Sequence, residues 1–211
     1  MADQDHDGSH IKGLVINFIH YFWPSLFKLP GFLVEFITPI IKISKGNQVI
    51  PFFTINDYNQ HLETCDMKGW SVKYYKGLGT SENEEAHEYF SQLEKHRIKF
   101  QYVGKEDDDA IVLAFDKKLA DKRKEWLAGY DPLVFVDHSI KILRYNDFVN
   151  KELISFSMMN NERAIPSLID GFKVGQRKIM YGCFKRNLKK EIKVAQLVGY
   201  IAENSAYHHG E

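Results

Sequence analysis

Apolar residues recur at helical spacing directly after the first ten positions of the chain. Their intervals of three and four residues predict an amphipathic helix, and Pro24 marks its approximate end. We expect Asp7 or Ser9 to cap its N-terminus, because both side chains can accept a hydrogen bond from the backbone there. The apolar stripe consists of Ile11, Leu14, Val15, Phe18, Ile19 and Phe22.

The pattern then changes to one that is typical of strands. Residues 36–53 are rich in Ile, Phe and Val, and Lys45-Gly46-Asn47 interrupts them, which predicts a β-hairpin. Residues 70–76 predict another strand, followed by a glycine-containing turn at 77–80.

Helical patterns return in the middle of the chain. Ser81 and Glu84 fit a capping box, and we expect the helix that follows to continue towards Ile98. His87 and His96 are expected on the surface of that helix.

The charged stretch 107–127 predicts further helix that ends near Gly129, with its five basic side chains forming a solvated face. Residues 129–144 are typical of a connector, with a turn at Asp131-Pro132.

The last third of the chain predicts short helices. The stretches 173–187 and 194–201 are amphipathic, and Lys189 and Lys190 lie in the basic turn between them. This arrangement fits a helix-turn-helix, and a plain helical hairpin with a basic surface is the alternative.

The first ten residues carry the candidate chemistry. Asp3, Asp5 and Asp7 alternate with other residues, and Gly8 closes the run. In extended backbone, residues two apart point to the same side, so these carboxylates can converge on one point. Their hard oxygens suit Mg²⁺ or Ca²⁺. An EF-hand is rejected because its twelfth position is Leu14 instead of Glu, and a solvated acidic turn remains the alternative.

Charge is distributed unevenly. The chain has 211 residues, with 28 basic and 28 acidic side chains, but residues 163–193 hold nine Lys or Arg against Asp170 and Glu191. A basic segment in a chain with a predicted metal site indicates a polyanion held near a metal. Cys65 and Cys183, the only cysteines, favour a reducing compartment, and we expect neither a signal peptide nor a membrane span.

Five stretches together resemble the central part of eukaryotic-type DNA topoisomerase II, an ATP-dependent type IIA enzyme. The resemblance implies an α/β fold. Residues 1–135 would form the C-terminal part of a Rossmann-like TOPRIM domain with an inserted hairpin and helices, and 136–211 a linker and the incomplete start of a mainly helical winged-helix domain. The stretches are Asp3 to Leu14, Lys73 to Ser81, Tyr145 to Leu153, Gly175 to Lys178 and Tyr207 to Glu211.

The resemblance also implies site residues. Asp3, Asp5 and Asp7 would bind Mg²⁺, or Mn²⁺ in its place, beside the scissile phosphate. The positions that would contact DNA are Lys76, Arg163, Lys173, Arg177, Lys178, His208 and His209.

The implied function is that of one part of a DNA-cleavage and religation gate, which changes DNA topology by ATP-dependent double-strand passage. The partners would be double-stranded DNA and, in the parent enzyme, ATP and a second identical copy of the chain. The location would be the nucleus, or a viral or cytoplasmic replication site.

Three departures limit the resemblance. Val174 stands where the family usually has Pro, the upstream Glu-Gly-Asp motif and ATPase region are absent, and the sequence stops before the Arg-Tyr nucleophile motif. We therefore expect no catalytic residue in this piece, inactivity alone, and no nucleophilic role for Tyr145 although Arg144 precedes it. The alternatives are a free-standing TOPRIM nuclease or primase-like protein and a non-catalytic DNA-binding module.

Overall fold

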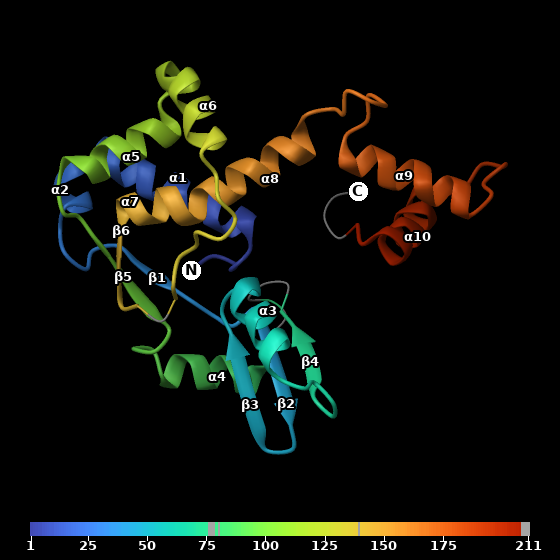
Figure 1. The fold of residues 1–211 in the computed structure, drawn as a ribbon, viewed down its shortest axis with the longest axis horizontal. Helices are drawn as coiled ribbons and strands as arrows, with labels where there is room; N and C mark the ends of the chain where they lie inside the picture. Colours follow the sequence, from blue (N-terminus) through green and yellow to red (C-terminus); the bar gives the residue numbers. More distant parts are fainter. Residues whose placement is uncertain (76–78, 80, 139, 208–211) are drawn as a thin grey trace. The chain divides into compact units, whose positions relative to one another are not determined.

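The structure is a computed structural model that describes residues 1–75, 79, 81–138 and 140–207. It divides into two compact units, Met1–Phe156 and Ser157–Glu211. The first unit is a mixture of strands and helices and the second is helical, which confirms the predicted α/β class (Figure 1). Among the helices described, none is both long enough and apolar enough to cross a membrane.

A three-stranded sheet of order β1-β5-β6 forms the centre of the first unit. β5 (Arg97–Gln101) pairs antiparallel with β1 (Val34–Phe36) and parallel with β6 (Ile142–Arg144). Helices α1 and α5 and the α7–α8 segment lie side by side next to this sheet in Figure 1. The helices are α1 (His6–Phe22), α2 (Pro24–Phe27), α5 (Lys105–Phe115), η2 (Lys117–Leu119), α6 (Ala120–Ala128), α7 (Tyr145–Asp147), the π-helix η3 (Phe148–Leu153) and α8 (Ile154–Ala164).

Aromatic rings fill the space between this sheet and its helices. The ring of Tyr145 stacks on Phe27 with centroids 4.1 Å apart and on Phe100 with centroids 5.2 Å apart. Phe148 meets Phe100 edge to face and is fully buried. Such packing orients the segment that enters α8, because large buried rings leave few alternative arrangements.

The second sheet of this unit is antiparallel, of order β3-β2-β4. Its hairpin turns at Gly46, where a positive φ of 60° suits glycine, as predicted. Ile41 and Ile43 of the hairpin are fully buried against Phe52 and Tyr58. The elements are β2 (Ile41–Lys45), β3 (Gln48–Phe52), α3 (Ile55–Thr64), β4 (Ser71–Tyr74) and α4 (Asn83–Ser91).

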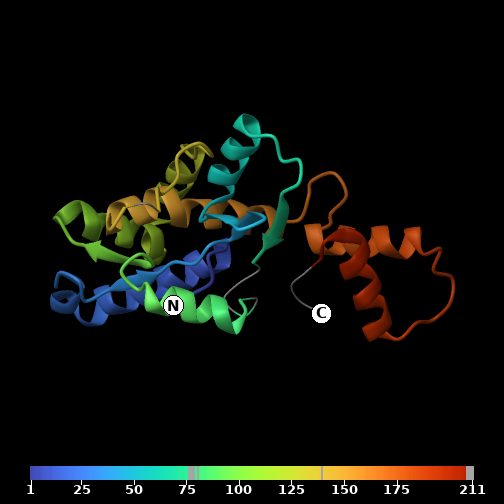
Figure 2. The same ribbon diagram turned by 90° about the horizontal axis from the view of Figure 1, so that it is seen from below.

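The second unit pairs two helices, α9 (Val174–Lys185) and α10 (Val194–Ser205), which confirms both predicted helices (Figure 2). A Cβ at Gly182 would overlap the Cδ1 atom of Ile201, so glycine allows their close approach. Ile201 is 2% exposed and anchors this contact.

Several local predictions were wrong. The helix expected from 81 to Ile98 ends at Ser91, because residues 97–101 extend as β5, and its capping box uses Glu82 and Glu85. The expected connector contains β6. His96 is buried, and its Nδ1 donates to the carbonyl oxygen of Ile37 at 2.9 Å.

Two further predictions need correction in the helical region. The expected continuous helix is broken at Asp116, between α5 and η2. Arg123 is not part of a solvated face, because its Nη1 donates to the carbonyl oxygens of Leu113 and Asp116.

The predicted domain boundary at 135/136 differs from the boundary of the compact units. Residues 136–156 pack with the first unit. Their assignment to a DNA-binding domain stays a prediction.

Candidate metal centre and nucleic-acid interface

The acidic run forms the entry to α1. Asp5, in extended backbone with φ −88° and ψ 175°, is the N-cap, and its Oδ1 accepts a hydrogen bond from the Gly8 backbone N–H at 2.7 Å. The predicted caps, Asp7 and Ser9, lie inside the helix. The capping carboxylate faces the positive end of the helix dipole, which stabilises its charge.

Neighbouring contacts fix the backbone of this run. The Gln4 side chain donates from Nε2 to the carbonyl oxygen of Phe36 at 3.1 Å. Gly8 is buried, and a Cβ there would overlap the carbonyl oxygen of Asp3, so only glycine lets residues 3–5 fold over the first helical turn.

The run offers the donors that Mg²⁺ prefers. Asp3, Asp5 and Asp7 are partly exposed, and the cap uses one of the two oxygens of Asp5. The three carboxylates do not form a group with all donor atoms within 4.8 Å of one another. The chemistry of this donor set fits a hydrated Mg²⁺ held by one or two carboxylates, and metal binding here stays a prediction.

Behind the run lies a buried ionic cluster that the sequence patterns did not predict. Lys12 forms ion pairs with Glu35, at 2.9 Å, and with Glu152. Ser9 Oγ donates to Glu152 Oε1 at 2.6 Å. The side chains of Lys12 and Glu35 are 10% and 3% exposed, so α1 is tied to β1 and η3 by largely desolvated charges.

The protonation states follow from burial and pairing. Burial alone would lower the pKa of Lys12, but Glu152 and Glu35 outweigh it and raise that pKa to about 12. Burial raises the pKa of Glu35. The pKa of Glu152 lies below its usual value, since Lys12 and Ser9 overcome the effect of burial. Lys12 therefore stays charged at neutral pH.

The DNA-contact candidates fall in different places. Arg163 lies in the last turn of α8, and its Nε donates to Asn160 Oδ1 at 3.3 Å. Lys173 is the N-cap residue of α9, and its backbone N–H donates to Gln176 Oε1 at 2.9 Å. Lys76, His208 and His209 lie outside the described residues.

Arg177 is held by a partner on the loop that precedes α9. Its Nε and Nη2 donate to the two carboxylate oxygens of Asp170, at 2.7 and 2.8 Å. The hydrogen bonds from Arg177 keep the pKa of Asp170 well below its usual range. Lys178 Nζ donates to the carbonyl oxygen of Ala206 at 3.0 Å. The structure therefore aims the two cations by different anchors.

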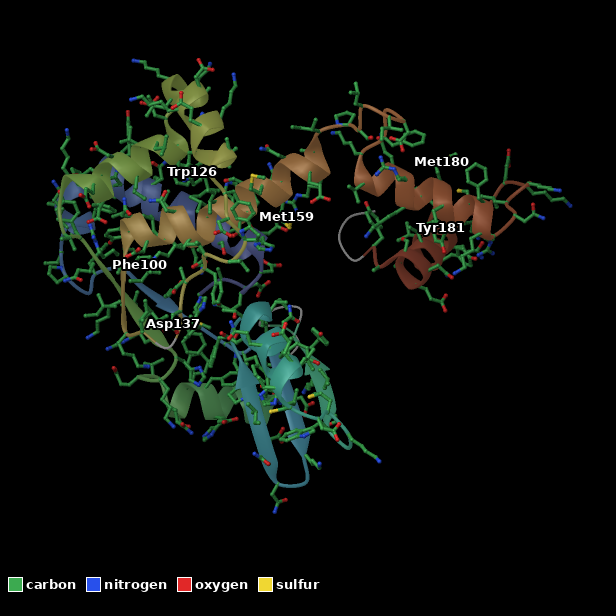
Figure 3. The ribbon with its side chains drawn as sticks, in the orientation of Figure 1. Phe100, Trp126, Asp137, Met159, Met180 and Tyr181 are labelled. Carbon is green, nitrogen blue, oxygen red and sulfur yellow. The ribbon has the colours of Figure 1, made fainter. Side chains whose placement is uncertain are left out.

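The connection between α9 and α10 is basic and exposed. The Arg186 guanidinium lies over the Tyr200 ring, 5.0 Å from its centroid. Figure 3 marks α9, from which this connection starts, with Met180 and Tyr181. The exposed cations here are Lys185, Arg186, Lys189, Lys190 and Lys193.

Comparison with known proteins places the chain in a family. The family model of the C-terminal associated domain of TOPRIM matches residues 36–161, and the DNA gyrase/topoisomerase IV family model matches residues 163–211.

Individual relatives match over the whole chain. DNA topoisomerase 2 of Plasmodium falciparum is 58% identical over 99% of the chain, and the mitochondrial DNA topoisomerase 2 of Dictyostelium discoideum is 60% identical over 100%. The chain spans 15% and 17% of the length of these two relatives.

A solved structure matches as well. The crystal structure of the Plasmodium falciparum topoisomerase II DNA-binding, cleavage and re-ligation domain superimposes with a TM-score of 0.87 and 58% identity, covering 100% of this chain and 29% of that one. The chain belongs to the DNA topoisomerase II family.

Proposed function

We propose that the chain is a segment of the DNA gate of a type IIA topoisomerase, which cuts one duplex, passes another through it and reseals the first. The observation that carries this proposal is the 58% identity, over the whole chain, to a solved DNA-binding, cleavage and re-ligation domain. A free-standing nuclease or a binding module would not require such a match from end to end.

Within the gate, Asp3, Asp5 and Asp7 would hold Mg²⁺, or Mn²⁺ in its place. A divalent ion there would neutralise charge that develops on phosphate oxygens. The chain's own contribution is to aim the run, through the Asp5 cap and the closely packed Gly8. The ionic cluster of Lys12 fixes the helix behind it.

Cations of the second unit would hold the duplex. Arg163, Lys173, Arg177 and Lys178, with Lys76, His208 and His209, would contact phosphates. Phosphate contacts fix register and orientation without reading sequence, as a gate that acts at many sites requires.

The same proposal covers the complete enzyme. It would be a homodimer that hydrolyses ATP, and its nucleophilic tyrosine would follow the His-His-Gly-Glu run. We propose a nuclear location for it, and a 60% identical mitochondrial relative makes fluorescence microscopy the direct check.

Exchange of this segment into the Plasmodium falciparum relative tests the proposal. We expect the chimaera to relax supercoiled plasmid with ATP and Mg²⁺, since the exchanged segments are 58% identical. Asp3→Asn with Asp5→Asn should lower relaxation by at least about 100-fold, because the ion loses its carboxylates. The control pair Asp109→Asn and Asp121→Asn removes two carboxylates elsewhere and should change little. A chimaera that binds DNA but never relaxes it would refute the gate assignment.

The isolated chain should bind duplex DNA with little sequence preference, with a Kd of about 10⁻⁴ to 10⁻⁶ M near physiological salt. Affinity should fall steeply with salt because phosphate contacts release counterions. Arg177→Ala should weaken binding equally for every sequence and reduce the salt slope by about 1. Fluorescence anisotropy at several salt concentrations measures both.

The ion pair of Arg177 sharpens this test. Arg177→Ala also leaves the charge of Asp170 without its partner, so Arg177→Ala with Asp170→Ala should bind more tightly than Arg177→Ala alone. Lys124→Ala removes an exposed cation of the first unit and serves as the matched control. Binding that is independent of salt, or equal loss with Lys124→Ala, would contradict this assignment.

A further inference from the structure

We propose that Glu35, His138 and Glu152 form a second metal site, for a divalent transition-metal ion such as Zn²⁺ or Mn²⁺. Each residue comes from a different element: Glu35 from β1, Glu152 from η3, and His138 from the segment between α6 and β6, next to Asp137 in Figure 3. One donor atom from each lies within 4.8 Å of the other two. Within the described part of the chain, no other group of three His, Cys, Asp or Glu side chains comes this close.

Three buried atoms of this group lack a hydrogen-bond partner among the described residues: Glu35 Oε1, His138 Nδ1 and Glu152 Oε2. Lys12 and Ser9 bond the opposite carboxylate oxygens, Glu35 Oε2 and Glu152 Oε1. Each carboxylate therefore keeps one oxygen for another ligand. A buried acceptor without a partner costs about 1–3 kcal/mol, and one bound cation would satisfy all three atoms.

Charge favours a cation in the same place. Glu35 and Glu152 together carry two negative charges, and Lys12 supplies one positive charge. The Glu35 and Glu152 side chains are 3% and 13% exposed, so bulk water neutralises the remaining charge poorly.

The donor types select the ion. One imidazole with two carboxylates suits Zn²⁺ or Mn²⁺, whereas Mg²⁺ prefers oxygen ligands alone. Bonds of about 2.0–2.2 Å to Zn²⁺ require the three donors to move slightly inward, which small rotations of the side chains supply. This site uses none of Asp3, Asp5 and Asp7.

Calorimetric titration of the 211-residue chain with ZnCl₂ tests the proposal. All samples carry Asp3→Asn and Asp5→Asn, so that the acidic run takes up no ion, and are first stripped with a chelator. We expect one saturable site, and His138→Ala should weaken it by at least about tenfold, since even outer-shell changes cost 10–100-fold. His87→Ala, at an exposed histidine, should leave it unchanged.

His138→Ala is the main variant because it leaves the ion pairs of Lys12 in place, so folding is retained. Nitrogen NMR gives an independent readout: Zn²⁺ should shift the Nδ1 signal that His138→Ala removes. EPR of Mn²⁺ should report the same site, and Glu35→Gln should weaken it. An absence of saturable binding, or binding that His138→Ala leaves intact, would overturn the proposal and leave water as the partner of the three atoms.

Discussion

Replacing Lys12 by methionine is expected to lower the free energy of unfolding by about 3–5 kcal/mol, because it leaves two buried carboxylates without their cation. Methionine keeps most of the aliphatic packing of the lysine stem, so the loss is mainly electrostatic. Urea denaturation at pH 7, followed by circular dichroism, measures it.

The pH dependence follows from the direction of the shift. The pKa of Lys12 is raised to about 12, so its stabilisation is complete below the unfolded value of about 10.4 and is lost as pH rises through 12. The difference between the parent chain and the variant should therefore persist from neutral to mildly alkaline pH.

An exposed ion pair supplies the control. Lys124 lies 2.8 Å from Asp121, with side chains 78% and 91% exposed, so Lys124→Met should change stability by less than about 1 kcal/mol. Lys12→Met with Glu35→Gln should recover part of the loss, since one buried charge is removed. A Lys12→Met chain as stable as Lys124→Met would show that the cluster does not hold α1.

The elements with strong local signals were predictable from the sequence. The hairpin at Gly46 and the helices α9 and α10 have turn residues or apolar spacing that decide their structure without help from distant segments. The end of α4 was not predictable in this way, because residues 97–101 are taken into a sheet by β1 and β6, which are distant in sequence.

The candidate site divides along the same line. The acidic run is visible as a spacing of carboxylates, but the cluster of Lys12, Glu35 and Glu152 joins residues from distant parts of the sequence, and only tertiary packing brings them together. Asp107 is a similar case. It belongs to an acidic stretch, yet it is fully buried and accepts hydrogen bonds from the backbone N–H groups of Val103 and Asn146. A Lys or Asp in an isolated sequence gives no sign of such burial, because these residues are usually exposed.

Tyr145 is expected to form no covalent bond to DNA, in this chain alone or within the chimaera. Its side chain is 1% exposed, its hydroxyl donates to the carbonyl oxygen of Phe27 at 3.1 Å, and Phe27 and Phe100 stack against its ring. A nucleophile must reach a phosphorus atom, and this hydroxyl would first have to leave the core.

The ionisation of Tyr145 argues in the same direction. Burial, followed by the charge of Asp107, raises its pKa above the usual value of about 10. The neutral phenol is therefore favoured in the folded chain, whereas attack on a phosphodiester needs an activated, phenolate-like oxygen. The raised pKa means that the associated stabilisation is complete below about pH 10 and is lost as pH rises further.

Two substitutions separate a structural role from a catalytic one. Tyr145→Phe removes one hydrogen bond and should cost about 1 kcal/mol of stability, whereas Tyr145→Ala empties a packed site and should cost about 3–5 kcal/mol. The chimaera with Tyr145→Phe should still form protein-linked breaks in supercoiled plasmid after denaturation with detergent. The isolated 211-residue chain should form none, with Mg²⁺ and ATP or without them. Breaks made by the isolated chain that vanish with Tyr145→Phe would instead identify Tyr145 as a nucleophile and the chain as a self-sufficient cleaving enzyme.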